Sequence, residues 1–227
     1  MNKYKKLLSN TLIFGIGSFG SKILLLLLTR LYTGNINPGD NSTKELLEIT
    51  TNFLIPIITF SIADAVIRYG IDRNFDKRRV FTSAYVIQTC GILGFIVLSP
   101  LLQLLPYTEN YVILLVLYCI ASAFRQINSQ FVRARGMVKL FALFFFNIFF
   151  IASLHPGVTG FMLSVILSDL LSGITLWMIG DLHRYFNLRY LDKRTTRMMI
   201  RFSIPLIPSA ILWVITCFSD RLFLRYM

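Results

Sequence analysis

Apolar runs of membrane-spanning length recur along this chain of 227 residues, and short charged segments separate them. A helix needs about 20 apolar residues to cross a hydrocarbon core of about 30 Å. Hydrophobic residues make up 55% of the chain and charged residues 15%, whereas soluble domains carry about 25% charged residues. The sequence therefore predicts an all-α, polytopic membrane helical bundle with no stretch long enough for a separate soluble domain.

About seven transmembrane helices are predicted from these runs. Pro56 lies inside the second run and predicts a kink there, because proline interrupts the hydrogen-bond ladder of a helix. The fifth run would reach only about 22 Å as a helix, which is less than the thickness of the hydrocarbon core. The predicted spans cover residues 9–32, 46–69, 80–105, 111–131, 140–154, 158–179 and 202–227.

Lysine and arginine residues alternate between the two sides of these spans. They gather in the N-terminal segment and after spans two, four and six, whereas the segments after spans one, three and five hold only Lys44. Positively charged segments stay on the cytoplasmic side of a membrane. We therefore expect a multi-pass protein of the cell inner membrane with a cytoplasmic N-terminus. The same pattern accounts for the net charge of +12 without a nucleic-acid partner.

Few residue patterns point to an enzyme or to a cofactor site. The run GIGSFG at 15–20 matches a dinucleotide-binding motif, but it lies inside an apolar span, where small residues allow close helix packing. His155 and His183 fall on opposite sides of the predicted membrane, without a partner at metal-ligand spacing. We expect no catalytic residues, no metal and no cofactor. A membrane-embedded glycan polymerase or acyltransferase would need a large outer loop or a His/Asp/Arg cluster, which the sequence lacks.

Ionisable residues inside the predicted spans are the candidate functional residues, because charge is costly in hydrocarbon and usually faces the protein interior. Lys22 lies near the middle of its span and is expected to face a watery cavity. Arg30, Arg68 and Arg221 lie near span ends, from which they could instead reach the surface. The candidate cavity cations are Lys22, Arg30, Arg68, Arg125 and Arg221, and the candidate ion-pair or coupling acids are Asp64, Asp169 and Asp220. Cations outnumber acids in this set, which suits an anionic substrate.

Several short runs, in this order and spacing, resemble the Wzx-type polysaccharide flippases of the multidrug/oligosaccharidyl-lipid/polysaccharide exporter superfamily. The first is SNT followed by GSFGSK in the first span, and the most family-like is SIPLIP followed by SDR in the seventh. The runs are SNT at 9–11, GSFGSK at 17–22, AVIRYG at 65–70, GVTG at 157–160, SIPLIP at 203–208 and SDR at 219–221. Together they extend the resemblance over essentially the whole chain.

The resemblance implies a V of two six-helix lobes around a central cavity. Members of the family move a lipid-linked oligosaccharide across the cytoplasmic membrane for cell-surface polysaccharide biosynthesis, often coupled to an ion gradient. The lipid carrier is a polyprenyl pyrophosphate, whose anionic head group matches the positive interior expected above. Cavity cations of the family lie on helices one, two and seven, which implies Lys22, Arg30, Arg68 and Arg221 in this chain.

The family continues for about six helices beyond helix seven. The resemblance therefore divides this chain into an N-terminal transmembrane lobe of six helices, 1–198, and the first helix of a second lobe, 199–227. We expect span seven to pack loosely outside the bundle. Without a second-lobe polypeptide as partner we expect no transport, because alternating access needs two lobes. The alternatives are a non-transporting fragment or partner subunit, and an exporter of small cationic drugs, whose cavity would carry acidic and aromatic residues.

The distribution of positive charge predicts the topology of the chain. Reporter fusions after Arg79, Lys139 and Lys193 are expected to report the cytoplasm, and fusions within 34–43 or at Thr108 are expected to report the outside. The measurement is paired alkaline phosphatase and green fluorescent protein activity in whole cells. Two or more reversed fusions would contradict the predicted topology.

Overall fold

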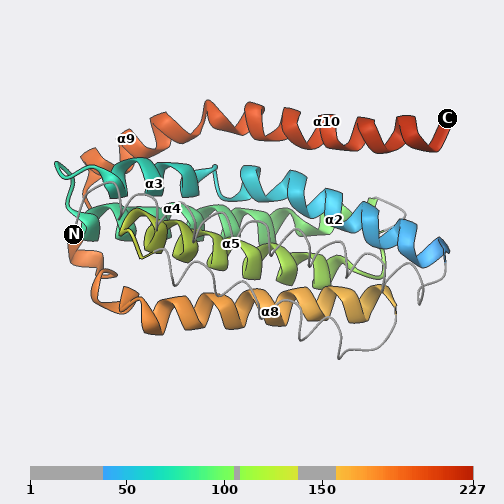
Figure 1. The fold of residues 1–227 in the computed structure, drawn as a ribbon, viewed down its shortest axis with the longest axis horizontal. Coiled ribbons are helices and arrows are strands. Elements are labelled where there is room, and N and C mark those ends of the chain that lie inside the picture. The colour runs from blue at the N-terminus through green and yellow to red at the C-terminus, as the bar shows by residue number, and fades with distance from the viewer. Residues whose placement is uncertain (1–37, 105–107, 138–156, 227) are drawn as a thin grey trace, which may run out of the picture.

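A computed structural model describes residues 38–104, 108–137 and 157–226, and every regular element among them is a helix (Figure 1). Four segments are long and apolar enough to cross a membrane, namely Lys77–Leu104, Val112–Ala134, Val158–Ile179 and Lys193–Ser219. The bent pair Ser42–Ile58 and Ile62–Ile71 makes a fifth if it crosses as one span. The predicted spans 9–32 and 140–154 lie outside the described residues, so the count of seven stays a prediction.

Two predicted spans coincide closely with single helices. Helix α8, Val158–Ile179, has the predicted bounds, and helix α5 covers Val112–Ala134. The predicted span 80–105 begins earlier, as helix α4, Lys77–Leu98, and ends as the 3₁₀ helix η1, Ser99–Leu104. Its α-helical part ends there because Pro100 has no N–H for the carbonyl of Ile96, and the Ser99 hydroxyl donates to that carbonyl at 2.8 Å instead.

The predicted second span is divided into two helices that are bent by 55°. Helix α2 covers Pro38–Ile58 and contains Pro56, and helix α3 covers Ile62–Ile71. The bend lies a few residues beyond the predicted kink, where Phe60 and Ser61 take left-handed backbone angles, with φ of 53° and 48°. The Ser61 N–H donates to the Pro56 carbonyl at 2.9 Å, so the chain remains hydrogen-bonded across the bend.

Gly91 allows helix α4 to lie directly against this bend. A β-carbon at Gly91 would be 1.8 Å from the carbonyl oxygen of Ile58 and 3.2 Å from the ring of Phe60. Gly94, one turn later on the same helix, has nothing within 4 Å of an equivalent atom. The close contact of two backbones at Gly91 therefore holds the position of the bend.

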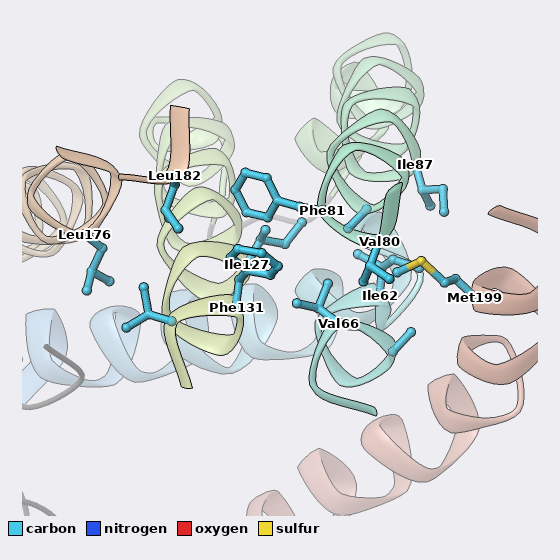
Figure 2. Packing of buried hydrophobic residues seen from close by; sticks show 13 residues of the cluster. Ile62, Val66, Val80, Phe81, Ile87, Ile127, Phe131, Leu176, Leu182 and Met199 are labelled. Carbon is cyan, nitrogen blue, oxygen red and sulfur yellow. The ribbon is translucent and has the colours of Figure 1, made fainter. Parts of the chain in front are cut away.

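A buried hydrophobic cluster joins α3, α4 and α5 (Figure 2). It includes Leu182 and Met199, so it lies near the end of the bundle that carries the basic segments. Ile62 and Val66 of α3 meet Val80 and Phe81 of α4, and the Phe81 ring lies 4.3 Å from that of Phe131. A second cluster fills the opposite half of the bundle with residues that include Leu47, Leu115, Tyr118, Phe161 and Met162. Burial of these side chains stabilises the contacts between the helices in both halves of the bundle.

Residues 193–201, predicted as part of a basic loop, instead belong to helix α9, Lys193–Ser203. Asp192 caps the helix, and its carboxylate accepts hydrogen bonds from the Thr195 hydroxyl at 2.8 Å and from the Arg194 N–H at 3.2 Å. These bonds, and to a smaller extent the positive charge of Arg79, hold the pKa of Asp192 below its usual range. A side-chain oxygen at this position satisfies N–H groups that have no partner inside the helix.

The segment between α8 and α9 closes the basic end of the bundle through two short 3₁₀ helices, η3 (Leu182–Arg184) and η4 (Leu188–Tyr190). The Thr82 hydroxyl donates to the Tyr185 carbonyl at 3.2 Å and accepts from the Asn187 N–H at 3.3 Å. The Arg78 guanidinium donates to the Tyr190 hydroxyl at 2.9 Å. The Arg135 guanidinium, at the end of α5, lies 4.6 Å from the centre of the Tyr185 ring. The basic segments that follow α3, α5 and α8 therefore lie together, as the alternating charge pattern requires.

Helix α10, Leu206–Tyr226, continues from α9 after a break at Ile204 and Pro205. Its main contacts are with α2 and α9, and it runs along one flank of the bundle, opposite α8 (Figure 1). Only 11% of the span window in Lys193–Ser219 is buried, in agreement with the expected peripheral position of span seven. The expected domain boundary between 198 and 199 falls inside α9, which packs on α3 and α4.

The contact at Gly91 predicts a destabilising substitution with a matched control. Gly91→Ala is expected to lower the free energy of unfolding by about 1–3 kcal/mol, because the added methyl group must displace the Ile58 backbone. Gly94→Ala should leave it unchanged or slightly higher. Thermal unfolding of both variants in detergent measures the effect, and equal stability of the two would show that the bend is not held at Gly91.

Candidate functional site

A cavity of about 680 Å³ lies between α10 and the bent pair of helices α2 and α3. Its lining combines charged, amide, aromatic and aliphatic side chains. The lining residues are Glu48, Ile49, Asn52, Pro56, Asp64, Leu206, Ser209, Ala210, Trp213, Val214, Cys217 and Phe218. This is the candidate substrate cavity of the described residues.

The local structure of α2 and α3 brings the polar side chains to one place. Glu48, Asn52 and Pro56 recur every four residues, so they share one face of α2. Asp64 follows the bend and lies in the first turn of α3. On α10, the small side chains of Ser209 and Ala210 stand opposite and keep the space open.

The charged side chains of the described lining, Glu48 and Asp64, are both acids. Neither has an ion pair with a cation of the described residues. Lys22 and Arg30 lie outside the described residues, as do the side chains of Asp220 and Arg221. The positive interior expected from the sequence is therefore not present in the part of the cavity that the structure describes.

Glu48 and Asn52 were not among the candidate residues predicted from the sequence. The signal was present, because a carboxylate and an amide four residues apart within an apolar run must share a helix face. Glu48 lies close to the start of the predicted span, where a charge is usually assigned to the membrane boundary. The bend places Asp64 at the same cavity, and only this arrangement identifies Glu48 and Asn52 as part of a site.

Arg68 lies at the basic end of α3 and not in the cavity lining. Its guanidinium lies 4.6 Å from the centre of the Phe202 ring on α9, close enough for a cation–π interaction. Arg68 is exposed, so this contact leaves part of the guanidinium open to the surroundings. The structure thus gives this predicted cavity cation a position where it joins α3 to α9.

Arg125 and Asp169 form an ion pair between α5 and α8. Their Nε and Oδ1 atoms are 2.6 Å apart, and the side chains are 22% and 2% exposed. The N–H direction does not align with this oxygen, so the contact is primarily electrostatic. The Ser122 hydroxyl donates a hydrogen bond to the other oxygen of Asp169. Each of these two predicted residues therefore has a partner inside the bundle, away from the cavity.

Small side chains let α5 and α8 approach closely around this pair. Ser164, Ser168 and Ser172 are buried and recur every four residues along α8, a pattern that favours close packing of membrane helices. A β-carbon at Gly173 would lie 2.5 Å from the Phe124 ring. The Asn128 amide donates to the Gly173 carbonyl at 3.1 Å, so polar contacts continue along the interface.

Among the described residues, no group of three or more histidine, cysteine, aspartate or glutamate side chains could hold a metal ion. The chain matches no protein-family model, no curated protein and no solved structure. The site is therefore interpreted from its own residues.

The burial of the Arg125–Asp169 pair predicts strongly coupled substitutions. Asp169→Ala is expected to lower the free energy of unfolding by about 3 kcal/mol, because it leaves a guanidinium without its counter-charge. The double variant Arg125→Met with Asp169→Leu should lose much less than the sum of the single variants. The measurement is reversible unfolding in mixed micelles, followed by circular dichroism.

Thr175→Ala is a suitable control for these variants, because Thr175 is only partly buried on α8 and its hydroxyl donates to the Leu171 carbonyl of its own helix. It should unfold like the unmodified protein. Additive losses at Arg125 and Asp169 would mean that the two charges do not stabilise each other.

Proposed function

We propose that this protein takes part in moving a lipid-linked oligosaccharide across the cytoplasmic membrane for cell-surface polysaccharide biosynthesis. The observation that carries the proposal is the cavity between α10 and the bent α2–α3 pair, which opens between apolar helices yet presents several polar side chains. A substrate with both a sugar part and a lipid part needs such a mixed surface. The resemblance of the sequence to polysaccharide flippases supports the same proposal.

The polar side chains of the cavity suit the sugar part of such a substrate. Carboxylate and amide oxygens of Glu48, Asn52 and Asp64 accept hydrogen bonds from hydroxyl groups, and the Asn52 amide also donates. Trp213 offers a broad ring against which the apolar face of a sugar can lie. A few polar groups on an otherwise apolar wall bind a ligand in one orientation.

The pyrophosphate of the carrier needs cations, which the described lining does not supply. In this proposal Lys22 and Arg30, together with Arg221, contact the pyrophosphate, as the resemblance implies. The basic end of the bundle faces the cytoplasm, in the orientation predicted from the charge distribution. Transport then moves the head group through the cavity while the polyprenyl chain stays in lipid, and no chemical bond is broken.

Export of a small organic cation is the second candidate, favoured by the acidic and aromatic character of the described lining. Glu48 and Asp64 would offset the charge of such a substrate, and the Trp213 ring would contact it through a cation–π interaction. This candidate differs from the first in its dependence on charge. It requires at least one of the two carboxylates, whereas sugar hydroxyl groups also bind to amides.

A binding experiment on the purified chain in lipid nanodiscs tests the proposal and separates the two candidates. The probes are a synthetic undecaprenyl-pyrophosphate-linked oligosaccharide and tetraphenylphosphonium. We expect the glycan lipid to bind, and Trp213→Ala or Lys22→Ala to weaken it by about tenfold, which corresponds to about 1.4 kcal/mol. Glu48→Gln with Asp64→Asn should weaken the glycan lipid only slightly, because the amides keep hydrogen-bonding oxygens.

Phe53→Ala is the matched control, because Phe53 is an aromatic residue of α2 that lies outside the cavity lining. It should bind both probes as the unmodified protein does. Binding of tetraphenylphosphonium that is lost in the double amide variant, without binding of the glycan lipid, would favour the second candidate. Unchanged glycan-lipid binding by Lys22→Ala and Trp213→Ala would contradict the proposed site.

A further inference from the structure

Helix α9 has a buried face and a basic face on opposite sides. Thr195, Met199 and Ser203 are buried, and Met199 points among Ile62 and Val80 (Figure 2). The four basic residues of the helix are exposed and, at about 100° per residue, fall within an arc of about 100° on the other side. They are Lys193, Arg194, Arg197 and Arg201. The helix therefore turns a cluster of positive charge away from the bundle.

These four cations have no ion pair with an acid of the described residues. Other basic side chains at the same end do have partners, since Arg79 lies 3.7 Å from Asp192 and Arg184 lies 3.4 Å from Asp181. Because several uncompensated positive charges on one face repel one another, the face is well suited to an anion. It lies at the start of the segment Lys193–Ser219, which is long and apolar enough to cross a membrane.

The same side of the chain becomes apolar as it continues into α10. Ile204 follows Arg201 by three residues and is 50% exposed, and Leu212 and Ile215 of α10 are 62% and 47% exposed. Lys193–Ser219 is straight enough to count as one candidate span. Positive charge at the helix start, followed by exposed aliphatic side chains, reproduces the order of head group and acyl chain in a phospholipid.

We propose that the outer face of α9 and α10 binds an anionic phospholipid of the adjacent leaflet, with its phosphate at Arg197 and Arg201 and its acyl chains along Ile204, Leu212 and Ile215. Basic clusters beside a membrane span attract anionic head groups. A guanidinium binds phosphate oxygens through paired hydrogen bonds. The continuity of charge with apolar surface favours a lipid over a soluble anion, because a soluble anion gains nothing from the aliphatic residues.

The described contacts of α10 are mainly with α2 and α9. Bound lipid would therefore add contacts that hold α9 and α10 in a defined position. The site faces away from the candidate substrate cavity, since none of its five residues belongs to the cavity lining. Occupation of this surface is therefore independent of the proposed transport substrate.

Native mass spectrometry of the full chain in detergent tests the proposal, with dioleoylphosphatidylglycerol and dioleoylphosphatidylcholine as the probes. We expect one phosphatidylglycerol to be retained at least about tenfold more strongly than phosphatidylcholine. Arg197→Gln with Arg201→Gln should remove this preference. Leu212→Ser should weaken retention of both lipids, because it places a hydroxyl group against the acyl chains.

Arg73→Gln with Arg189→Gln is the control, because both residues are exposed at the same end of the bundle and their loss changes the net charge equally. This variant should keep the preference for phosphatidylglycerol. Equal loss in the two double variants would show a diffuse charge effect and overturn the proposed site. Displacement of the lipid by millimolar glycerol 3-phosphate would also overturn it, because acyl chains would then contribute nothing to binding. Circular dichroism confirms that each variant remains helical.

Discussion

The contact between α5 and α8 is the interaction on which the rest of the bundle depends. Two opposite charges, Arg125 and Asp169, meet there with the carboxylate almost fully buried, so each charge offsets the cost of burying the other. The serines of α8 and the absence of a side chain at Gly173 bring the helices close enough for this pairing. The opposite faces of α5 then support α3 and α4, and these in turn support α9.

The elements predicted best from the sequence are those whose ends are marked by local chemistry. Helix α8 lies between Gly157 and Gly180, and its apolar run of membrane-spanning length predicts a single helix between these glycines. Helix α9 was mistaken for a loop because its charges dominated the pattern, although Asp192 at its start and the buried positions 195, 199 and 203 are typical of an amphipathic helix. Pro56 indicated a kink, but the bend formed at Phe60 and Ser61 because Gly91 of α4 accommodates the chain there.

The site was harder to predict than the fold because a site depends on which helix faces meet. Arg125 and Asp169 were recognised as unusual within apolar runs, but 44 residues separate them, and only the packing of small side chains determines that they face each other. Likewise, Glu48 lies on α2 and Asp64 lies on α3, on opposite sides of the bend. In a straight helix the two carboxylates would lie at a different angle and separation. The left-handed backbone of Phe60 and Ser61 therefore brings both acids to the cavity.

The bend divides the second span into two helices that pack against different neighbours. Helix α3 is held by contacts with α4, α5 and α9 and belongs to the hydrophobic cluster at the basic end. Helix α2 beyond the bend forms one wall of the cavity and carries α10 on its side. The width of the cavity therefore depends on the bend at Phe60 and Ser61, which the close contact between Ile58 and Gly91 holds in position. The second span thus has two separately anchored halves, since Leu47 and Ile58 bury α2 in the second hydrophobic cluster and Ile62 and Val66 bury α3 in the first.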